Sequence, residues 1–104
     1  MTQITEDTFE QVLQIFKESL EIDLQEATFI DPYGMVSILE FGEYLKSNGI
    51  QKTMRLPKSD EVLKYLERMD FFKFAGEYFI LVPPDPQLSE KYLRSSYSDV
   101  LLEI

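Results

Sequence analysis

Two kinds of hydrophobic pattern alternate along the chain. Three stretches carry apolar residues at the three- and four-residue spacing of an amphipathic helix, and three shorter stretches have the apolar runs or alternation of strands. In chain order, the predicted elements are a helix from Thr5 to about Ser19, a strand Leu20–Leu24, a helix Asp31–Asn48, a strand Gln51–Leu56, a helix Ser59–Phe72 and a strand Glu77–Val82. This alternation predicts an α/β fold with a small, mainly parallel or mixed sheet.

The first and third predicted helices each have an apolar stripe that should face the core. The stripe of the first helix is Phe9, Val12, Leu13, Phe16 and Leu20. The stripe of the third is Val62, Leu63, Leu66 and Met69, and Phe71 and Phe72 should pack inward at its end.

The residues after Val82 predict smaller elements. Pro83–Pro86 should form a stiff extended loop, because proline fixes φ and restricts the residue before it. Leu88–Leu93 predicts a short helix and Ser95–Ser98 a turn. Val100–Ile104 predicts a last strand, which would pair with the sheet or, in a dimer, with a second copy of the chain.

The helix Asp31–Asn48 has its own start and stop signals. Asp31 can cap the helix and Pro32 suits its first position, while Asn48 and Gly49 provide a left-handed end. Apolar residues and glycines occupy one arc of the helical wheel, which should therefore be buried. The residues of this arc are Gly34, Met35, Ile38, Leu39, Phe41, Gly42 and Leu45.

The opposite arc of the same helix is the best candidate for a working surface. It consists of Tyr33, Val36, Ser37, Glu40, Glu43 and Tyr44. A core helix does not need two tyrosines and a valine on its outer side, and tyrosine is enriched among interface anchors. Two interpretations remain open for Tyr33, Val36 and Tyr44: contact with a neighbouring loop such as 83–86, or a protein-binding patch.

The first predicted strand should have one side that differs from the other. Leu20, Ile22 and Leu24 alternate with Glu21 and Asp23. A parallel strand covered on both faces would be apolar throughout. One side of this strand should therefore be partly open, or its carboxylates should be held by donors.

Composition narrows the function. The 104 residues predict a single domain, 1–104. The chain has no cysteine and no histidine, which removes thiol chemistry and the commonest general base and metal ligand. No apolar run approaches the length of a membrane span, and the acidic N-terminus does not resemble a signal peptide, so we expect a cytoplasmic protein with no membrane span.

The charge is strongly acidic and unevenly distributed. The net charge is −9, and residues 1–50 hold ten acids and two bases. This balance argues against nucleic acid as a partner, because phosphate binding needs a dominant basic surface. The bases of residues 51–73 are mostly interrupted by acids, which favours a solvated face over an anion site.

A carboxylate site is the main enzymatic alternative. Glu21, Asp23 and Asp31 could form a paired-carboxylate centre. The simpler interpretation makes Asp31 a helix cap and the other two solvated or strand-edge acids. No spacing resembles a calcium loop, and Gly34 is the only glycine at the strand-to-helix turn where phosphate would bind. We therefore predict a protein that is not an enzyme, with no metal and no cofactor.

A family resemblance centres on Phe29, Ile30, Asp31 and Gly34. An apolar strand, then Phe-Ile-Asp-x-x-Gly, then an amphipathic helix ending in Asn-Gly resembles the STAS domain, the family of sulphate transporters and anti-sigma-factor antagonists. The match covers roughly residues 6–74. It implies a STAS-like fold, although the chain lacks residues for the strand pair that usually opens this domain.

The resemblance also implies a function. Antagonists of this family are bacterial regulators that dock a histidine-kinase-like ATPase or an anti-sigma factor, and they carry a phosphorylatable serine just before the motif glycine. Here that position is Tyr33, so we predict constitutive binding with no phosphorylation at the motif. The alternative is an N-terminal interaction domain or structural subunit of a larger assembly. The predicted partner-binding residues are Asp31, Pro32, Tyr33, Val36, Ser37, Glu40 and Tyr44.

Overall fold

The fold was obtained as a computed structural model, which describes residues 3–82. Over this range the chain forms four helices and five short strands, which confirms the α/β class. The elements are β1 (Gln3–Ile4), α1 (Phe9–Glu18), β2 (Glu21–Asp23), β3 (Phe29–Ile30), α2 (Pro32–Ser47), β4 (Lys52–Arg55), α3 (Asp60–Arg68), α4 (Phe71–Tyr78) and β5 (Phe79–Val82). The loop, helix, turn and strand predicted within residues 83–104, and the dimer through that strand, lie outside the described residues.

The strands of the described range form two small parallel sheets. The larger sheet has the order β2-β4-β5, and the smaller one pairs β1 with β3. Ile22, Met54 and Leu81 are in register across the larger sheet and face the core. The sequence pattern did not predict β1 and β3, because two residues are too few to show a period.

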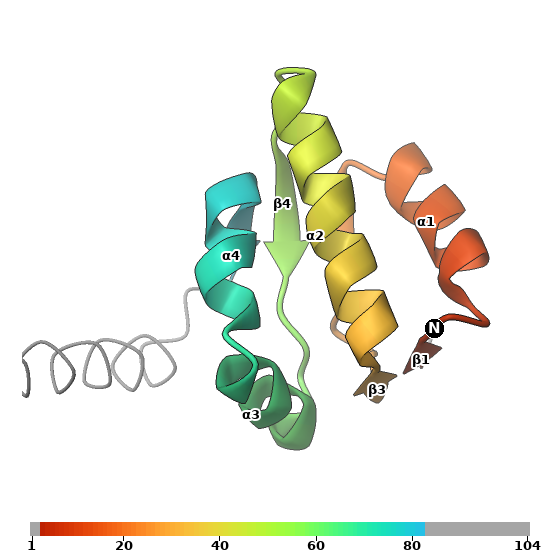
Figure 1. The fold of residues 1–104 in the computed structure, drawn as a ribbon, viewed down its shortest axis with the longest axis vertical. Coiled ribbons are helices and arrows are strands. Elements are labelled where there is room, and N and C mark those ends of the chain that lie inside the picture. The colour runs from red at the N-terminus through yellow and green to blue at the C-terminus, as the bar shows by residue number, and fades with distance from the viewer. Residues whose placement is uncertain (1–2, 83–104) are drawn as a thin grey trace, which may run out of the picture.

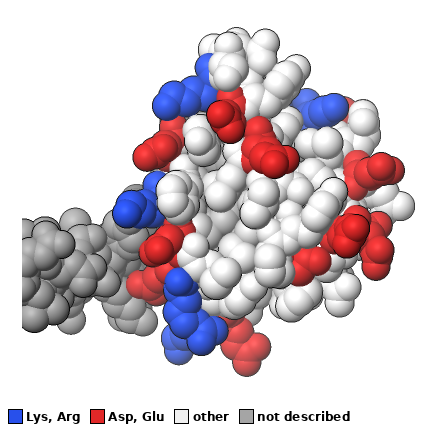
Figure 2. All heavy atoms as spheres, viewed as in Figure 1, with Lys and Arg blue, Asp and Glu red and all other residues white. Residues whose placement is uncertain are grey.

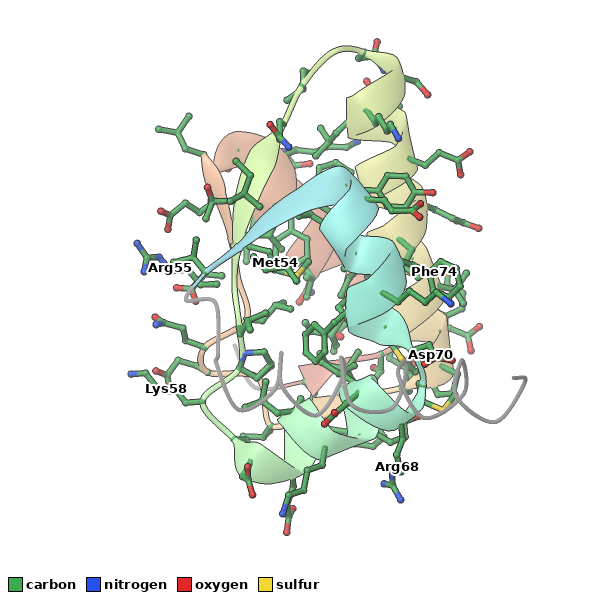
Figure 3. The ribbon with its side chains drawn as sticks, turned by 90° about the vertical axis from the view of Figure 1, so that its left-hand side faces the viewer. Met54, Arg55, Lys58, Arg68, Asp70 and Phe74 are labelled. Atoms are coloured by element: carbon green, nitrogen blue, oxygen red, sulfur yellow. The ribbon has the colours of Figure 1, made fainter. Side chains whose placement is uncertain are left out.

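The larger sheet has helices on one side only within the described part of the chain. Figure 1 shows α4 and α2 on either side of β4 in this view, with α1 beyond α2 and α3 at the lower end. Figure 3 shows Met54 pointing toward the helices and Arg55 pointing away from them. The other face carries Glu21, Asp23 and Ile80, so the expectation of a partly open side is confirmed.

Both ends of α2 form as predicted. The backbone N–H of Gly34 donates to Oδ1 of Asp31 over 2.7 Å, and Pro32 occupies the first turn. At the other end Gly49 has a φ of 70°, and its N–H donates to the carbonyl oxygen of Lys46. The predicted inner arc is buried except for Leu39, which is half-buried.

Two glycines bring α2 unusually close to its neighbours. A Cβ atom at Gly34 would strike the carbonyl oxygen of Ile4 in β1. At Gly42 it would lie 2.7 Å from Cβ of Tyr78 and 2.8 Å from Cε2 of Phe79. The two glycines therefore set the depth at which α2 packs against β1 and against the junction of α4 with β5.

A lysine from the sheet holds the end of α1. Nζ of Lys52 donates to the carbonyl oxygens of Phe16 and Ser19 over 2.8 and 2.7 Å, and it lies 5.9 Å from the ring centre of Phe41. Carbonyl groups at the end of a helix lack partners within the helix and carry partial negative charge. Lys52 therefore fixes α1 against β4 and α2.

Two predictions in the first part of the chain are wrong. The first helix begins at Phe9 rather than Thr5, because residues 5–8 form a turn in which the backbone N–H of Thr5 donates to Oγ1 of Thr8. Leu20, predicted to be buried, is 90% exposed. The chain bends at Ser19 and Leu20 between α1 and β2, so the alternation that buries Ile22 does not extend back to Leu20.

The sequence analysis also missed α4. Asp70 has a φ of 58°, a left-handed conformation that aspartate tolerates better than most residues, and it separates α3 from α4. Phe71 and Phe72 are buried as predicted, but they begin a helix. Met69 was predicted to belong to the buried stripe and is instead half-exposed, because α3 ends at Arg68.

The close approach at Gly34 gives a stability prediction. Gly34→Ala should lower the free energy of unfolding by about 1–3 kcal/mol, and Gly34→Leu by more, since the new side chain overpacks against Ile4. Urea titration followed by circular dichroism measures the change.

Gly76 provides the matched control for this prediction. It is exposed in α4, and a Cβ there would meet only Cδ1 of Leu81 at 4.0 Å. Gly76→Ala should be neutral or stabilise the fold, because alanine favours a helix over glycine. Equal effects at the two glycines would contradict the packing assigned to Gly34.

Candidate functional site

An open groove runs between α1 and the outer side of α2. Its volume is about 500 Å³. Helix α1 supplies one wall and α2 the other, and the two helices start at the same end of the molecule (Figure 1). The groove is lined by Phe9, Glu10, Leu13, Lys17, Tyr33, Ser37, Glu40, Phe41 and Tyr44.

Aromatic rings form much of the groove lining. The ring of Tyr33 meets that of Phe9 edge-on, with centroids 6.3 Å apart and an interplanar angle of 81°. Tyr44 lies nearly parallel to Phe41, with centroids 6.4 Å apart and an angle of 20°. Each tyrosine thus rests on a buried phenylalanine, while 50% of Tyr33 and 58% of Tyr44 stay exposed. Such rings offer a rigid apolar surface with a polar end.

The face that carries α2 is uncharged at its centre. Figure 2 shows acidic side chains on the right-hand, upper and left-hand parts of this face, and basic ones mainly at its left and upper edges. Val36 is 54% exposed on the outer side of α2. Scattered exposed apolar residues are normal on protein surfaces, but a contiguous uncharged area marks a candidate contact surface.

The structure divides the predicted partner-binding residues into two groups. Tyr33, Ser37, Glu40 and Tyr44 come together in the groove. Ser37 is half-buried there, and the other three are exposed. The remaining predicted residues do not line it: Val36 lies beside the groove, and Asp31 and Pro32 lie at the start of α2.

The carboxylate of Asp31 holds two parts of the chain together. Besides the N–H of Gly34, it accepts a hydrogen bond from the backbone N–H of Glu6 over 3.3 Å, through Oδ2. Its own backbone N–H donates to the carbonyl oxygen of Ile4 over 3.1 Å. Asp31 therefore fixes the start of α2 to the turn that precedes α1, and this role aligns the two walls of the groove.

Sequence reasoning missed the contribution of α1. Phe9 and Leu13 were assigned to the core stripe of the first helix, and Glu10 and Lys17 were not singled out. Each of the four also borders the groove. A helical wheel can show that Leu13 faces inward, but it cannot show which helix lies beside it, so no signal in one sequence would have identified this wall.

The three candidate catalytic carboxylates have separate partners. Glu21 accepts two hydrogen bonds from Arg55, at 2.6 Å from Nε and 3.2 Å from Nη2. Oδ1 of Asp23 accepts a bond from the backbone N–H of Gln25 over 2.9 Å. Asp31 caps α2. Within residues 3–82, no group of three or more carboxylate, histidine or cysteine side chains is placed to hold a metal ion.

Several basic side chains of residues 51–73 have carboxylate or backbone carbonyl partners. Beyond Arg55 and Lys52, Lys64 lies 3.0 Å from Asp60 and Lys58 lies 3.6 Å from Glu26. A further hollow of about 570 Å³ follows α3, but its lining is Glu61, Lys64, Glu67 and Arg68. All four side chains are charged and come from one helix, so this hollow has no apolar or aromatic residue in its lining.

Comparison with protein-family models, with curated proteins and with solved structures gives no match. The resemblance to the STAS domain therefore stays a prediction from the residues that carry it. Among the helices of the described residues, none combines the length and the apolar composition needed to cross a membrane.

The ion pair on the open sheet face gives a pH prediction. The hydrogen bond from Arg55 lowers the pKa of Glu21 from its ordinary value of 4.5, against a smaller opposing effect of desolvation. The stabilisation from this pair should be complete above pH 4.5 and should be lost as the pH falls through the lowered pKa. Carboxyl-carbon NMR titration should give a midpoint for Glu21 below 4.5 that rises in Arg55→Gln.

Lys58→Gln is the control for this titration, because it removes a base that pairs with Glu26 rather than Glu21. It should leave the midpoint of Glu21 unchanged. A midpoint that is the same in Arg55→Gln as in the original protein would show that Arg55 does not hold the charge of Glu21.

Proposed function

We propose that this chain is a non-enzymatic protein-interaction module that docks a partner through the outer side of α2. The observation that supports this most is the aromatic groove. The outer arc of α2 contributes Tyr33 and Tyr44 to this groove, and α1 forms its other wall. Large aromatic residues that stay half-exposed on a rigid base are typical of interface anchors.

The packing of α2 supports the same proposal. The inner arc of α2 is buried in the core through Ile38, Phe41 and Leu45. Tyr33 and Tyr44 contribute edge and stacking contacts with Phe9 and Phe41, yet each leaves half or more of its surface in solvent. A change on the outer side can therefore alter binding with little effect on folding.

The resemblance to STAS antagonists suggests the partner class, a histidine-kinase-like ATPase or an anti-sigma factor in a bacterial cytoplasm. The proposed interaction is constitutive, because the acceptor position of the motif is Tyr33 and no serine occupies residues 31–34. Ser37 is the nearest serine and is half-buried in the groove. A stoichiometric phosphate on residues 31–37, in the intact mass of protein from its native cell, would contradict constitutive binding.

Removal of the aromatic anchors tests the docking surface. Tyr33→Ala combined with Tyr44→Ala should weaken binding to the native partner at least tenfold, since anchor residues commonly contribute more than about 1–2 kcal/mol each. The thermal midpoint should change little, because both rings are half-exposed. Quantitative capture of the partner from the native cell, followed by titration with the purified partner, measures the loss.

Phe74→Ala is the matched control. Phe74 is an aromatic residue on α4 with 47% exposure, close to that of Tyr33, but it does not line the groove. Its replacement should leave partner binding unchanged. Unaltered binding by the double tyrosine variant, or an equal loss in Phe74→Ala, would overturn the assignment of the surface.

A further inference from the structure

The groove between α1 and α2 has a chemistry that narrows the kind of partner. Its apolar lining comes from Phe9, Leu13 and Phe41, all buried or half-buried. Tyr33 and Tyr44 stand on the α2 wall, one near each end. An occupant must therefore present an apolar stripe between two aromatic contacts.

The charged residues of the groove are mainly acidic. Glu10 on α1 and Glu40 on α2 are both exposed, against one base, Lys17, in the last turn of α1. The exposed acids Glu6 and Asp7 precede α1. The whole chain has a net charge of −9, so the field around the groove favours approach of a positive segment.

The geometry of the walls favours a helix as the occupant. The ten residues of α1 span about 15 Å, which corresponds to between two and three helical turns. Figure 1 shows α1 and α2 side by side with a shared direction. A third helix can pack along the groove between two such helices, with its side chains at i, i+3, i+4 and i+7 as anchors.

We propose that the groove binds an amphipathic helix of a partner protein, with an apolar stripe of Leu or Phe flanked by Lys and Arg. This inference rests on the proposed docking function and specifies its partner chemistry. The apolar stripe would lie on Leu13 and Phe41 between the two tyrosines. The flanking bases would face Glu10 and Glu40.

Two other candidate occupants of the groove, a segment of this chain and a second copy of it, are negatively charged. Residues 83–104 of this chain contain four acids and two bases, a net charge of −2. A second copy of the chain would bring a further −9. Like charges disfavour both at an acidic groove, whereas a basic helix gains from the same field.

Defined peptides test this proposal with the full-length chain. Three helical peptides of about 14 residues, or roughly 21 Å, are sufficient. The first has a Leu and Phe stripe with Lys and Arg flanks, the second has the same stripe with Glu flanks, and the third has the basic composition with a scrambled stripe. Amide NMR titration at low salt should show that the first binds along α1 and the outer side of α2, at least tenfold more tightly than the other two.

Charge variants then connect binding to the groove. Glu10→Gln combined with Glu40→Gln should lower the affinity for the basic peptide about threefold to tenfold at low salt. The affinity should also depend less on salt concentration. Glu61→Gln with Glu67→Gln removes the same charge from α3, on a different surface, and should have little effect. If the two double variants lose the same affinity for the basic peptide, binding depends only on the net charge of the chain, and the proposal is overturned.

Every other outcome of the titration is also decisive. Equal binding of the basic and acidic peptides, binding of the scrambled peptide, shifts centred elsewhere, or no binding at all would each overturn the basic-helix inference. None of these results would overturn docking through α2, because that function is judged with the native partner and the tyrosine variants. Loss of peptide binding in the variant that combines Tyr33→Ala with Tyr44→Ala would support both the basic-helix inference and docking through α2.

Discussion

The described fold depends on how closely α2 approaches the strands and helix around it. Gly34 packs against the backbone of β1, and Gly42 packs against Tyr78 and Phe79, with no room for a Cβ at either point. Close-packed interiors tolerate little change in volume, so these two contacts determine where α2 lies relative to both sheets. The cap formed by Asp31 then ties the same end of α2 to the turn before α1.

In this arrangement the two sides of α2 have different roles. The inner side holds the core together, and the outer side borders a groove whose other wall is α1. Asp31 was predicted both as a helix cap and as a partner-binding residue. The structure shows its carboxylate occupied by two backbone N–H groups, so its contribution to the proposed docking is to align the groove walls.

The sequence predicted the parts of the fold that have strong local signals. The two ends of α2, its buried arc, the alternation in β2 and the α/β class all follow from capping residues and hydrophobic period. Helix α4 was missed because Phe71, Phe72 and Gly76 have poor helix propensity, and burial of the two phenylalanines outweighs it. Leu20 and Met69 were misplaced because each lies one or two residues beyond the end of a helix, where the period no longer applies.

Of the two walls of the candidate site, only the one on α2 could be predicted from the sequence, for a related reason. Tyr33, Ser37, Glu40 and Tyr44 share one arc of α2, and the wheel shows this directly. The facing wall depends on which helix packs beside α2, and that is decided by tertiary contacts such as Lys52 at the end of α1 and Asp31 at its beginning. Neither contact has a signature in the local sequence.

The division of α2 into two independent sides is the central claim, and one comparison of variants tests it most directly. Ile38 is fully buried and Val36, two residues earlier, is 54% exposed. Aspartate at position 38 would be an unpaired buried charge, whereas at position 36 it would lie in solvent. Urea unfolding followed by circular dichroism should show Ile38→Asp unfolded without denaturant and Val36→Asp within about 0.5–1 kcal/mol of the original protein. Two variants that unfold at the same urea concentration would contradict the claim.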